Sequence, residues 1–237
     1  MNVECVSRTH VGCKRKINED AILVASERGL WAVADGMGGH ESGEVASGMV
    51  VEALRALPDN PVPDEAAADA IDVLRRVNRE LVDMARVQSR EKSIGTTVVG
   101  IIVADDVFRC FWAGDSRAYL MRDGQMHRLS RDHSLVQDLV DAGMLKPEEA
   151  EGHANSNVIT RAVGVSETLE VDVVGGVAQS GDLFLLASDG LTRVMTDQEI
   201  AAELRHGANN QAIDALLDCV IERGAPDNVS MIIVKLG

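Results

Sequence analysis

The sequence lacks the long apolar runs, paired cysteines and internal repeats that mark several large classes of protein. No apolar stretch approaches the roughly 18 residues that a membrane-spanning helix needs, and the opening MNVECVSRTH has no apolar signal core. No self-similarity at a period of about 20–50 residues is present, which argues against solenoids and propellers. The four cysteines form no CxxC pair, so we expect free thiols, a cytoplasmic location and no membrane insertion.

Basic and aromatic residues are also scarce. The chain has 23 lysines and arginines against 38 acidic residues, a formal charge of −15, whereas nucleic-acid binding demands a basic face. Aromatic residues make up only 3% and no P-loop is present, which disfavours nucleotides. Most of the negative charge is interpreted as a solvated surface. We therefore expect no nucleic-acid partner. The protein is also expected to be a monomer.

Strand-like segments are frequent in what remains. With 237 residues and 46% hydrophobic content, the chain can bury a substantial core as one domain, residues 1–237. Residues 2–9 and 21–34 are predicted strands, with SERG (26–29) as a hairpin turn. Residues 97–129 are predicted to form a meander with a turn at Asp123-Gly124. Two late strands are predicted at roughly 182–188 and 229–235.

Helical patterns alternate with these strands. Apolar spacing predicts a helix with one face formed by Val45, Met49, Ala53, Leu54 and Leu57. A long helix capped by Asp64 follows, Thr196 and Glu199 predict a capping box, and Gly224 ends the last helix. Tight turns between strands favour antiparallel pairing. The interpretation is an α+β fold: a four-layer α-β-β-α sandwich of two packed antiparallel sheets flanked by helices.

Two connecting segments differ in character. Residues 58–63, PDNPVP, are interpreted as a helix–helix connection rather than a domain linker. Residues 135–157 are polar, and Pro147 opens a short helix within them. We interpret this second segment as a surface excursion that flanks a site.

Aspartates follow several apolar runs or stand in glycine-rich turns. They are Asp20 in INED, Asp35 in ADGMGG, Asp115 in AGDSR, Asp189 in SDG and Asp227 in PDN. Glu19 adjoins the first of them. Any one alone is explained as a turn aspartate, because Asp-Gly and Asp-Asn are common turn formers. Several strands that deliver aspartate to the same kind of end instead predict one shared site.

Such a site requires cations. Two carboxylates about 4 Å apart repel by roughly 4 kcal/mol at an effective dielectric near 20. A carboxylate-rich oxygen cluster suits Mg²⁺ or Mn²⁺. The histidines form no HxH or HExxH pattern and no DxDxDG loop occurs, which disfavours zinc and an EF-hand calcium site.

A small basic island, Lys14-Arg15-Lys16, precedes Glu19 in this acidic protein. A guanidinium offers a bidentate fork to phosphate, whereas the two lysines are interpreted as solvated charges. Metals beside such an arginine suggest hydrolysis of a phosphate ester by metal-activated water.

Eight motifs occur in order between about residue 8 and residue 236: GCKRKINED, ADGMGGH, SIGTT, AGDSRAY, RDHS, NVITRAVG, LLASDGL and PDNVSMI. Their wording and order resemble the PP2C-like (PPM) family of metal-dependent serine/threonine protein phosphatases, in its bacterial catalytic-domain-only form. The resemblance implies a β-sandwich flanked by helices, with residues 135–157 as a variable flap beside the cleft.

The resemblance also implies roles for individual residues. Asp35 would bridge two metals, with the Gly36 carbonyl also coordinating, and Asp189 and Asp227 would complete the first metal's ligands. Glu19 matches the acid that reaches the second metal, directly or through water, and Asp20 supports it. Asp115 matches the acid that joins Asp189 at a third metal in bacterial members. Arg15 occupies the place of the phosphate-binding arginine.

The implied mechanism is in-line attack on phosphorus by a metal-bridging hydroxide, without a phosphoenzyme. Eukaryotic members have a histidine two residues after the DG aspartate, where this chain has Met37. His40 is the nearest replacement, and a structural turn role explains it at least as well, so no general acid is assigned. His133 is expected to fix a loop, and Trp31 and Trp112 are expected in the core.

The leading hypothesis is a protein-serine/threonine phosphatase that acts on phosphoproteins and opposes a bacterial Ser/Thr kinase. Its motifs resemble stand-alone phosphatases paired with secretion-system kinases, type VI in particular. Two alternatives remain: a catalytically inactive relative that binds phosphoproteins, and a hydrolase of small phosphate esters. Retention of Asp35, Asp189 and Asp227 argues against the inactive relative.

Overall fold

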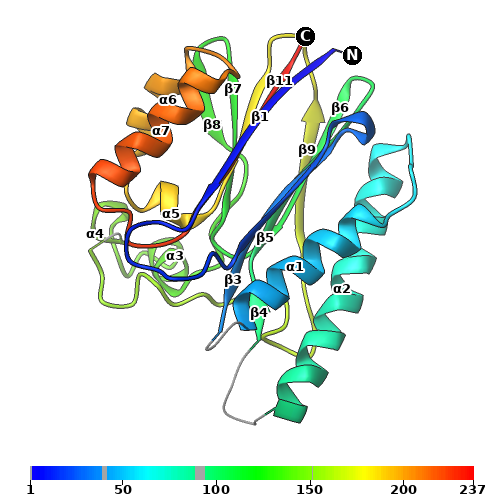
Figure 1. Ribbon diagram of the computed structural model, residues 1–237, viewed down its shortest axis with the longest axis vertical. Coiled ribbons are helices and arrows are strands. Elements are labelled where there is room, and N and C mark those ends of the chain that lie inside the picture. Colours follow the sequence, from blue (N-terminus) through cyan, green and yellow to red (C-terminus); the bar gives the residue numbers. More distant parts are fainter. Residues whose placement is uncertain (1, 39–41, 89–93, 151) are drawn as a thin grey trace.

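The strands of the protein form two antiparallel sheets. A computed structural model describes residues 2–38, 42–88, 94–150 and 152–237 (Figure 1). The first sheet has the order β1 (Val3–His10), β11 (Val229–Leu236), β10 (Leu183–Ala187), β7 (Arg117–Arg122) and β8 (Gln125–Arg128). The second has the order β2 (Asp20–Ala25), β3 (Leu30–Met37), β5 (Val98–Ala104), β6 (Val107–Ala113) and β9 (Asp172–Val177), with β4 (Gly95–Thr96) paired to β3.

The central strands are buried on both faces, which explains their nearly continuous apolar runs. Successive side chains of a strand point to opposite faces. In β11, Ile232 packs between the two sheets, whereas Ile233 packs against the helices outside the first sheet. In β3, Trp31 lies between the sheets and Ala32 faces the helices outside the second sheet. Both tryptophans are buried, as predicted, with Trp31 at 0% and Trp112 at 4% exposure.

Helices cover both outer faces (Figure 1). α1 (Ser42–Arg55) and α2 (Pro63–Gln88) pack on the second sheet. α5 (Asp189–Thr192), α6 (Asp197–Leu204) and α7 (Asn210–Glu222) pack on the first. The predicted four-layer α-β-β-α sandwich is therefore confirmed. The remaining helices are the 3-10 turn η1 (Ser26–Arg28), α3 (Leu135–Asp141) and α4 (Pro147–Ala150).

Several local predictions are confirmed. Residues 26–29 turn the chain between β2 and β3, which pair as a hairpin. Thr196 and Glu199 form the capping box of α6, and Pro147 opens α4. None of the described helices is both long and apolar enough to cross a bilayer.

The predicted meander over residues 97–129 is wrong at its centre. β5 pairs with β6 and β7 pairs with β8, but β6 belongs to the second sheet and β7 to the first. The chain changes sheets at Gly114, whose φ of 123° lies outside the range that side chains favour. A Cβ there would lie 2.5 Å from the Thr97 Cβ. This corner places Asp115 at the end of the sandwich.

Two helix predictions and one strand also need correction. Val45 is 43% exposed, because α1 approaches β3 through Gly43 and its buried face includes Ala46 and Val50. The other four predicted residues do face the core: Leu54 is buried, and Met49, Ala53 and Leu57 are partly buried against it. α2 begins at Pro63, so Asp64 lies in its first turn rather than at its cap. β9 was not predicted, since its Gly-Gly pair is typical of a turn.

Candidate active site

Asp20 and Asp35 face each other at one end of the second sheet. They are paired across β2 and β3 in register. Asp20 is 9% exposed, and its Oδ2 accepts a 2.8 Å hydrogen bond from the Ser188 hydroxyl, whereas its buried Oδ1 has no donor. Burial raises the pKa of Asp20 to about 6. The strand pairing therefore brings two carboxylates together at a desolvated position.

The backbone around Asp35 is held on both sides. Its N–H donates to the Thr97 hydroxyl at 3.1 Å, and its carbonyl accepts from the Thr97 N–H at 2.8 Å. A Cβ on the next residue, Gly36, would lie 2.1 Å from the Gly43 carbonyl oxygen and 2.5 Å from that of Glu19. Only glycine fits there, so α1 and the residue before β2 come close to the acidic strand end. Glu19 is partly buried at this junction.

Asp115 and Asp189 share one arginine. Asp115 follows the corner after β6, and Asp189 opens α5 directly after β10. Arg193 Nη2 lies 2.9 Å from Oδ2 of each carboxylate. Burial raises the pKa of Asp189 to about 7, and Arg193 opposes that shift. Burial also raises the pKa of Asp115, whose Oδ1 is buried without a hydrogen-bond partner.

Asp227 lies in the loop before β11, opposite Arg15. Arg15 Nη2 donates to Asp227 Oδ2 at 2.7 Å, and this pairing raises the pKa of the half-exposed arginine. Asn228 fastens the loop that carries Arg15: its Nδ2 donates to the carbonyls of Val11 and Ile17 at 2.8 and 3.0 Å. Its Oδ1 accepts from the Glu19 N–H at 2.8 Å.

Asp35 stands among the other aspartates. Its pKa is held well above the usual range, first by burial and then by repulsion from the four remaining members of the set, Asp189, Asp20, Asp115 and Asp227. The five aspartates predicted from the sequence therefore lie near enough to repel one another, with Arg15 and Glu19 beside them, and we call this group the acidic pocket. His40 lies outside the described residues.

The side chains present fit divalent cations. Buried carboxylate oxygens without donors are costly, and two of them, Asp20 Oδ1 and Asp115 Oδ1, belong to this pocket. The donor set is all oxygen, which suits Mg²⁺ and Mn²⁺. Over the described ranges, no three histidine, cysteine or acidic side chains already surround one point as metal ligands. Arg15 and Arg193 instead hold three of the carboxylates.

His133 fixes the loop that carries Asp115, as predicted. The His133 ring Nδ1 accepts a 3.1 Å hydrogen bond from the Gly114 N–H. The backbone N–H of His133 donates to the Gly114 carbonyl at 2.9 Å. The ring stacks on Trp112, with centroids 6.0 Å apart. This imidazole therefore supports the corner between the sheets.

A cavity of about 850 Å³ adjoins Asp115, Asp189 and Arg193. Part of its remaining wall comes from α3, α4 and the residues around Asn157, and the rest from β7, β8 and the start of α6. Figure 1 shows α3 and α4 beside α5, at the same end of the molecule. Residues of α3, α4 and the Asn157 loop therefore share this cavity with Asp115 and Asp189.

Comparison with known proteins identifies the family. A family model for protein phosphatase 2C matches residues 11–230. The chain belongs to the protein phosphatase 2C family. The family resemblance seen in the motifs is thereby confirmed.

Individual PP2C relatives support this assignment. The chain is 34% identical over 230 residues to the serine/threonine protein phosphatase PstP of Mycobacterium tuberculosis. That match covers 97% of this chain but 44% of PstP, so the chain spans less than half of that relative.

Two solved structures share the PP2C fold along nearly their whole length. PppA, described as a key regulatory component of T6SS in Pseudomonas aeruginosa, is 37% identical with a TM-score of 0.91, covering 99% of this chain and 98% of PppA. The catalytic domain of PstP in complex with two manganese ions is 32% identical with a TM-score of 0.87, covering 98% and 97%.

Four residues that contact the acidic pocket were not predicted from the sequence: Thr97, Ser188, Arg193 and Asn228. Three of them lie inside motifs that were recognised, SIGTT, LLASDGL and PDNVSMI. Arg193 stands four residues after Asp189, a helical spacing at which opposite charges meet, and this spacing was the available signal.

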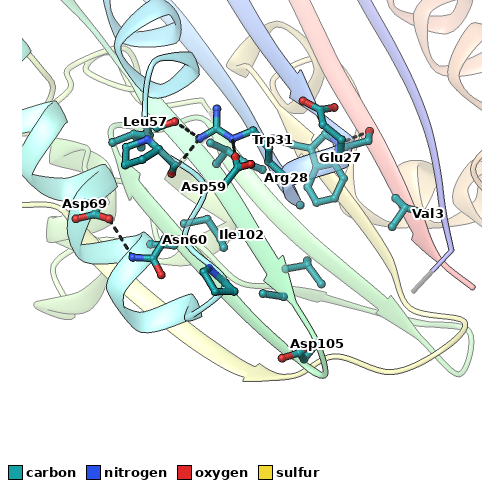
Figure 2. Close-up of a pocket in the computed structure, with 18 residues that line it drawn as sticks. Val3, Glu27, Arg28, Trp31, Leu57, Asp59, Asn60, Asp69, Ile102 and Asp105 are labelled. Carbon is teal, nitrogen blue, oxygen red and sulfur yellow. Dashed lines mark hydrogen bonds and ion pairs between the residues drawn. The ribbon is translucent and has the colours of Figure 1, made fainter.

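A second cavity, of about 350 Å³, lies at the other end of β3. Trp31, near the start of β3, lines it, whereas Asp35 stands near the opposite end of the strand. Figure 2 shows Arg28 at its wall, where it donates to the Leu57 carbonyl at 2.6 Å and pairs with Asp59 at 2.7 Å. These contacts hold the α1–α2 connection in place, away from the acidic pocket.

Proposed function

We propose that this chain dephosphorylates phosphoserine and phosphothreonine in proteins, using two Mn²⁺ or Mg²⁺ ions, with a third at Asp115 and Asp189. The proposal is supported by five neighbouring aspartates that repel one another, two of which, Asp20 and Asp115, keep buried oxygens without donors. The two manganese ions bound by the PstP catalytic domain support the choice and number of ions.

Each residue of the pocket has a task in this proposal. Asp35, with the Gly36 carbonyl, would hold both ions; Asp189 and Asp227 would complete one site, and Glu19, supported by Asp20, the other. Bound divalent ions supply an activated water and positive charge for the phosphoryl oxygens. Arg15 orients the phosphate through its planar fork, because its half-exposed guanidinium can turn from Asp227 toward a ligand.

The surroundings suggest how substrates are chosen. We infer that residues 135–157 form a flap within a single PP2C domain of residues 1–237, because they wall the cavity beside Asp189. A phosphoprotein segment is expected to lie between this flap and Arg15. We further propose a cytoplasmic monomer that opposes a Ser/Thr kinase. The likeness to PppA, described as a T6SS component, supports a secretion-system context.

One assay tests the proposal. The purified protein is given p-nitrophenyl phosphate and a phosphothreonine peptide, first with Mn²⁺ and then with chelator. We expect turnover of both that chelator abolishes. Turnover of the small ester alone would indicate a small-ester hydrolase, and turnover that survives chelation would contradict the metal mechanism. No turnover with Mn²⁺ would favour a phosphoprotein-binding relative.

Two asparagine variants sharpen the assay. Asp35→Asn should lower turnover by at least roughly 100-fold, since even residues that only support a metal ligand change affinity or activity by about 10–100-fold. Asp72→Asn is the matched control, because Asp72 is an exposed aspartate on α2. Equal activity of the two variants would refute the assignment of Asp35.

A further inference from the structure

Arg193 connects the acidic pocket to the segment 135–157. Its Nη2 lies 2.9 Å from Asp115 Oδ2 and 2.9 Å from Asp189 Oδ2. Its Nη1 donates to Asn157 Oδ1 at 2.5 Å. One side chain thus binds two carboxylates of the pocket and the end of the flap at the same time.

Asp115 shows that this position attracts a cation. The residue is 6% exposed, and its Oδ1 is buried with no hydrogen-bond donor. Arg193 occupies the other oxygen only. A buried carboxylate with one free oxygen retains capacity for a further positive group.

A guanidinium and a divalent ion cannot both occupy this position. A Mg²⁺ ion bonds oxygen at about 2.1 Å and demands near-octahedral geometry. An Nη2 atom within 2.9 Å of both carboxylate oxygens fills the space between them. Two cations so close would also repel strongly.

We propose that Arg193 is an internal cation that competes with a divalent ion for Asp115 and Asp189, and that ion binding there releases Asn157. This inference rests on the proposed metal site but goes beyond it, because it assigns a positioning role to an arginine of this chain. Displacement of Arg193 frees its hydrogen bond to Asn157 and opens the adjoining cavity of about 850 Å³ to the pocket. Occupancy of the third ion site then sets the position of the flap.

Mn²⁺ binding, measured by titration calorimetry, tests the competition. Arg193→Gln removes the internal cation, and we expect its weakest Mn²⁺ site to bind roughly tenfold more tightly, equivalent to about 1.4 kcal/mol. Arg193→Lys keeps the charge and should stay closer to wild type. Arg8→Gln is the matched control, because Arg8 is 32% exposed against 35% for Arg193 and pairs with Asp214 at 2.7 Å.

A double variant separates competition from loss of folding. Asp115→Asn combined with Arg193→Gln removes one negative and one positive charge, so the net charge of the site is unchanged. The gain in Mn²⁺ affinity seen in Arg193→Gln should then vanish. A titration of Arg193→Gln that superimposes on wild type would overturn the competition alone. Absence of Mn²⁺ binding by the wild-type protein would overturn the proposed metal site as well.

Hydrogen exchange tests the link to the flap. In a peptide covering residues 152–161, saturating Mn²⁺ should speed exchange in the wild type by severalfold. Asn157→Ala should exchange quickly with or without Mn²⁺, because its bond to Arg193 is already lost. Wild-type exchange that is unaffected by Mn²⁺ would contradict the release of Asn157.

Discussion

At the scale of single residues, Arg15 and its neighbours differ in their contacts with the acidic pocket. Arg15 pairs with Asp227 at 2.7 Å at the edge of the acidic pocket. Lys16, in the same basic island, is exposed. The guanidinium is therefore the group that we propose to meet a phosphate beside the carboxylates.

Arg15→Ala is expected to raise KM for phosphate esters by about tenfold, with a smaller change in kcat, because charge-assisted hydrogen bonds to phosphate contribute on the order of 1.5–3 kcal/mol and exposure lowers that value. Steady-state kinetics with p-nitrophenyl phosphate measure both constants. Lys16→Ala should behave as wild type. An unaltered KM in Arg15→Ala would move the phosphate contact elsewhere.

The acidic residues could be predicted individually because each one follows an apolar run or stands in a glycine-rich turn. Arg193 could not be predicted in the same way. Its contact with Asp115 spans 78 positions of sequence, and no pattern near Arg193 predicts that contact. The helical spacing indicates the contact with Asp189, whereas the contact with Asp115 becomes visible only in the folded chain.

At the scale of elements, the loop between β1 and β2 depends on one buried asparagine. Asn228 is 4% exposed and makes three hydrogen bonds to residues 11–19. These bonds hold in place the segment that carries Arg15 and Glu19. The loop is therefore held by Asn228, directly before β11, and not only by contacts within the loop.

Asn228→Ala is expected to lower the free energy of unfolding by about 2–3 kcal/mol, because it leaves buried backbone groups without partners. It should also weaken Mn²⁺ binding, since Glu19 loses its anchor. Urea unfolding and calorimetry measure the two effects. Asn2→Ala, at an exposed asparagine before β1, serves as control. Wild-type stability of Asn228→Ala would show that the loop is held in another way.

Strands and turns with strong local patterns were predictable, and the change of sheet at Gly114 was not. The motif AGDS looks like an ordinary turn between neighbouring strands. Its real geometry is set by Thr97, which leaves no room for a side chain at Gly114. Local sequence gives the turn but not which sheet the next strand joins.

At the scale of the whole molecule, the pair of packed sheets follows from apolar runs that are buried on both faces. The exposed position of Val45 and the omission of β9 leave this architecture unchanged. The buried aspartates at one end have a consequence for the entire fold, because their charge repulsion opposes folding in the absence of cations.

Metal-free protein is expected to lose stability as pH rises. The folded-state pKa values of Asp20 and Asp189 are raised to about 6 and about 7, so the folded state holds protons that the unfolded chain has released. Their contribution is fully present below the usual aspartate pKa of about 4 and is lost as pH passes through 6 and 7. The expected loss is on the order of a few kcal/mol between about pH 5 and about pH 7.5.

Urea unfolding in chelator at these two pH values measures the loss, and saturating Mn²⁺ should remove it. His133, whose pKa is lowered by burial, acts with the opposite sign near pH 6.5. Asp189→Asn isolates the acidic pocket and should flatten the pH dependence. Metal-free stability that rises over this range in both proteins would contradict the repulsion.

The most direct measurement of the central claim is an anomalous difference map at the manganese absorption edge, from crystals grown with Mn²⁺. The account predicts peaks among Asp35, Asp189 and Asp227 in the wild type and their loss in Asp35→Asn. A wild-type map without manganese among these three carboxylates would contradict it.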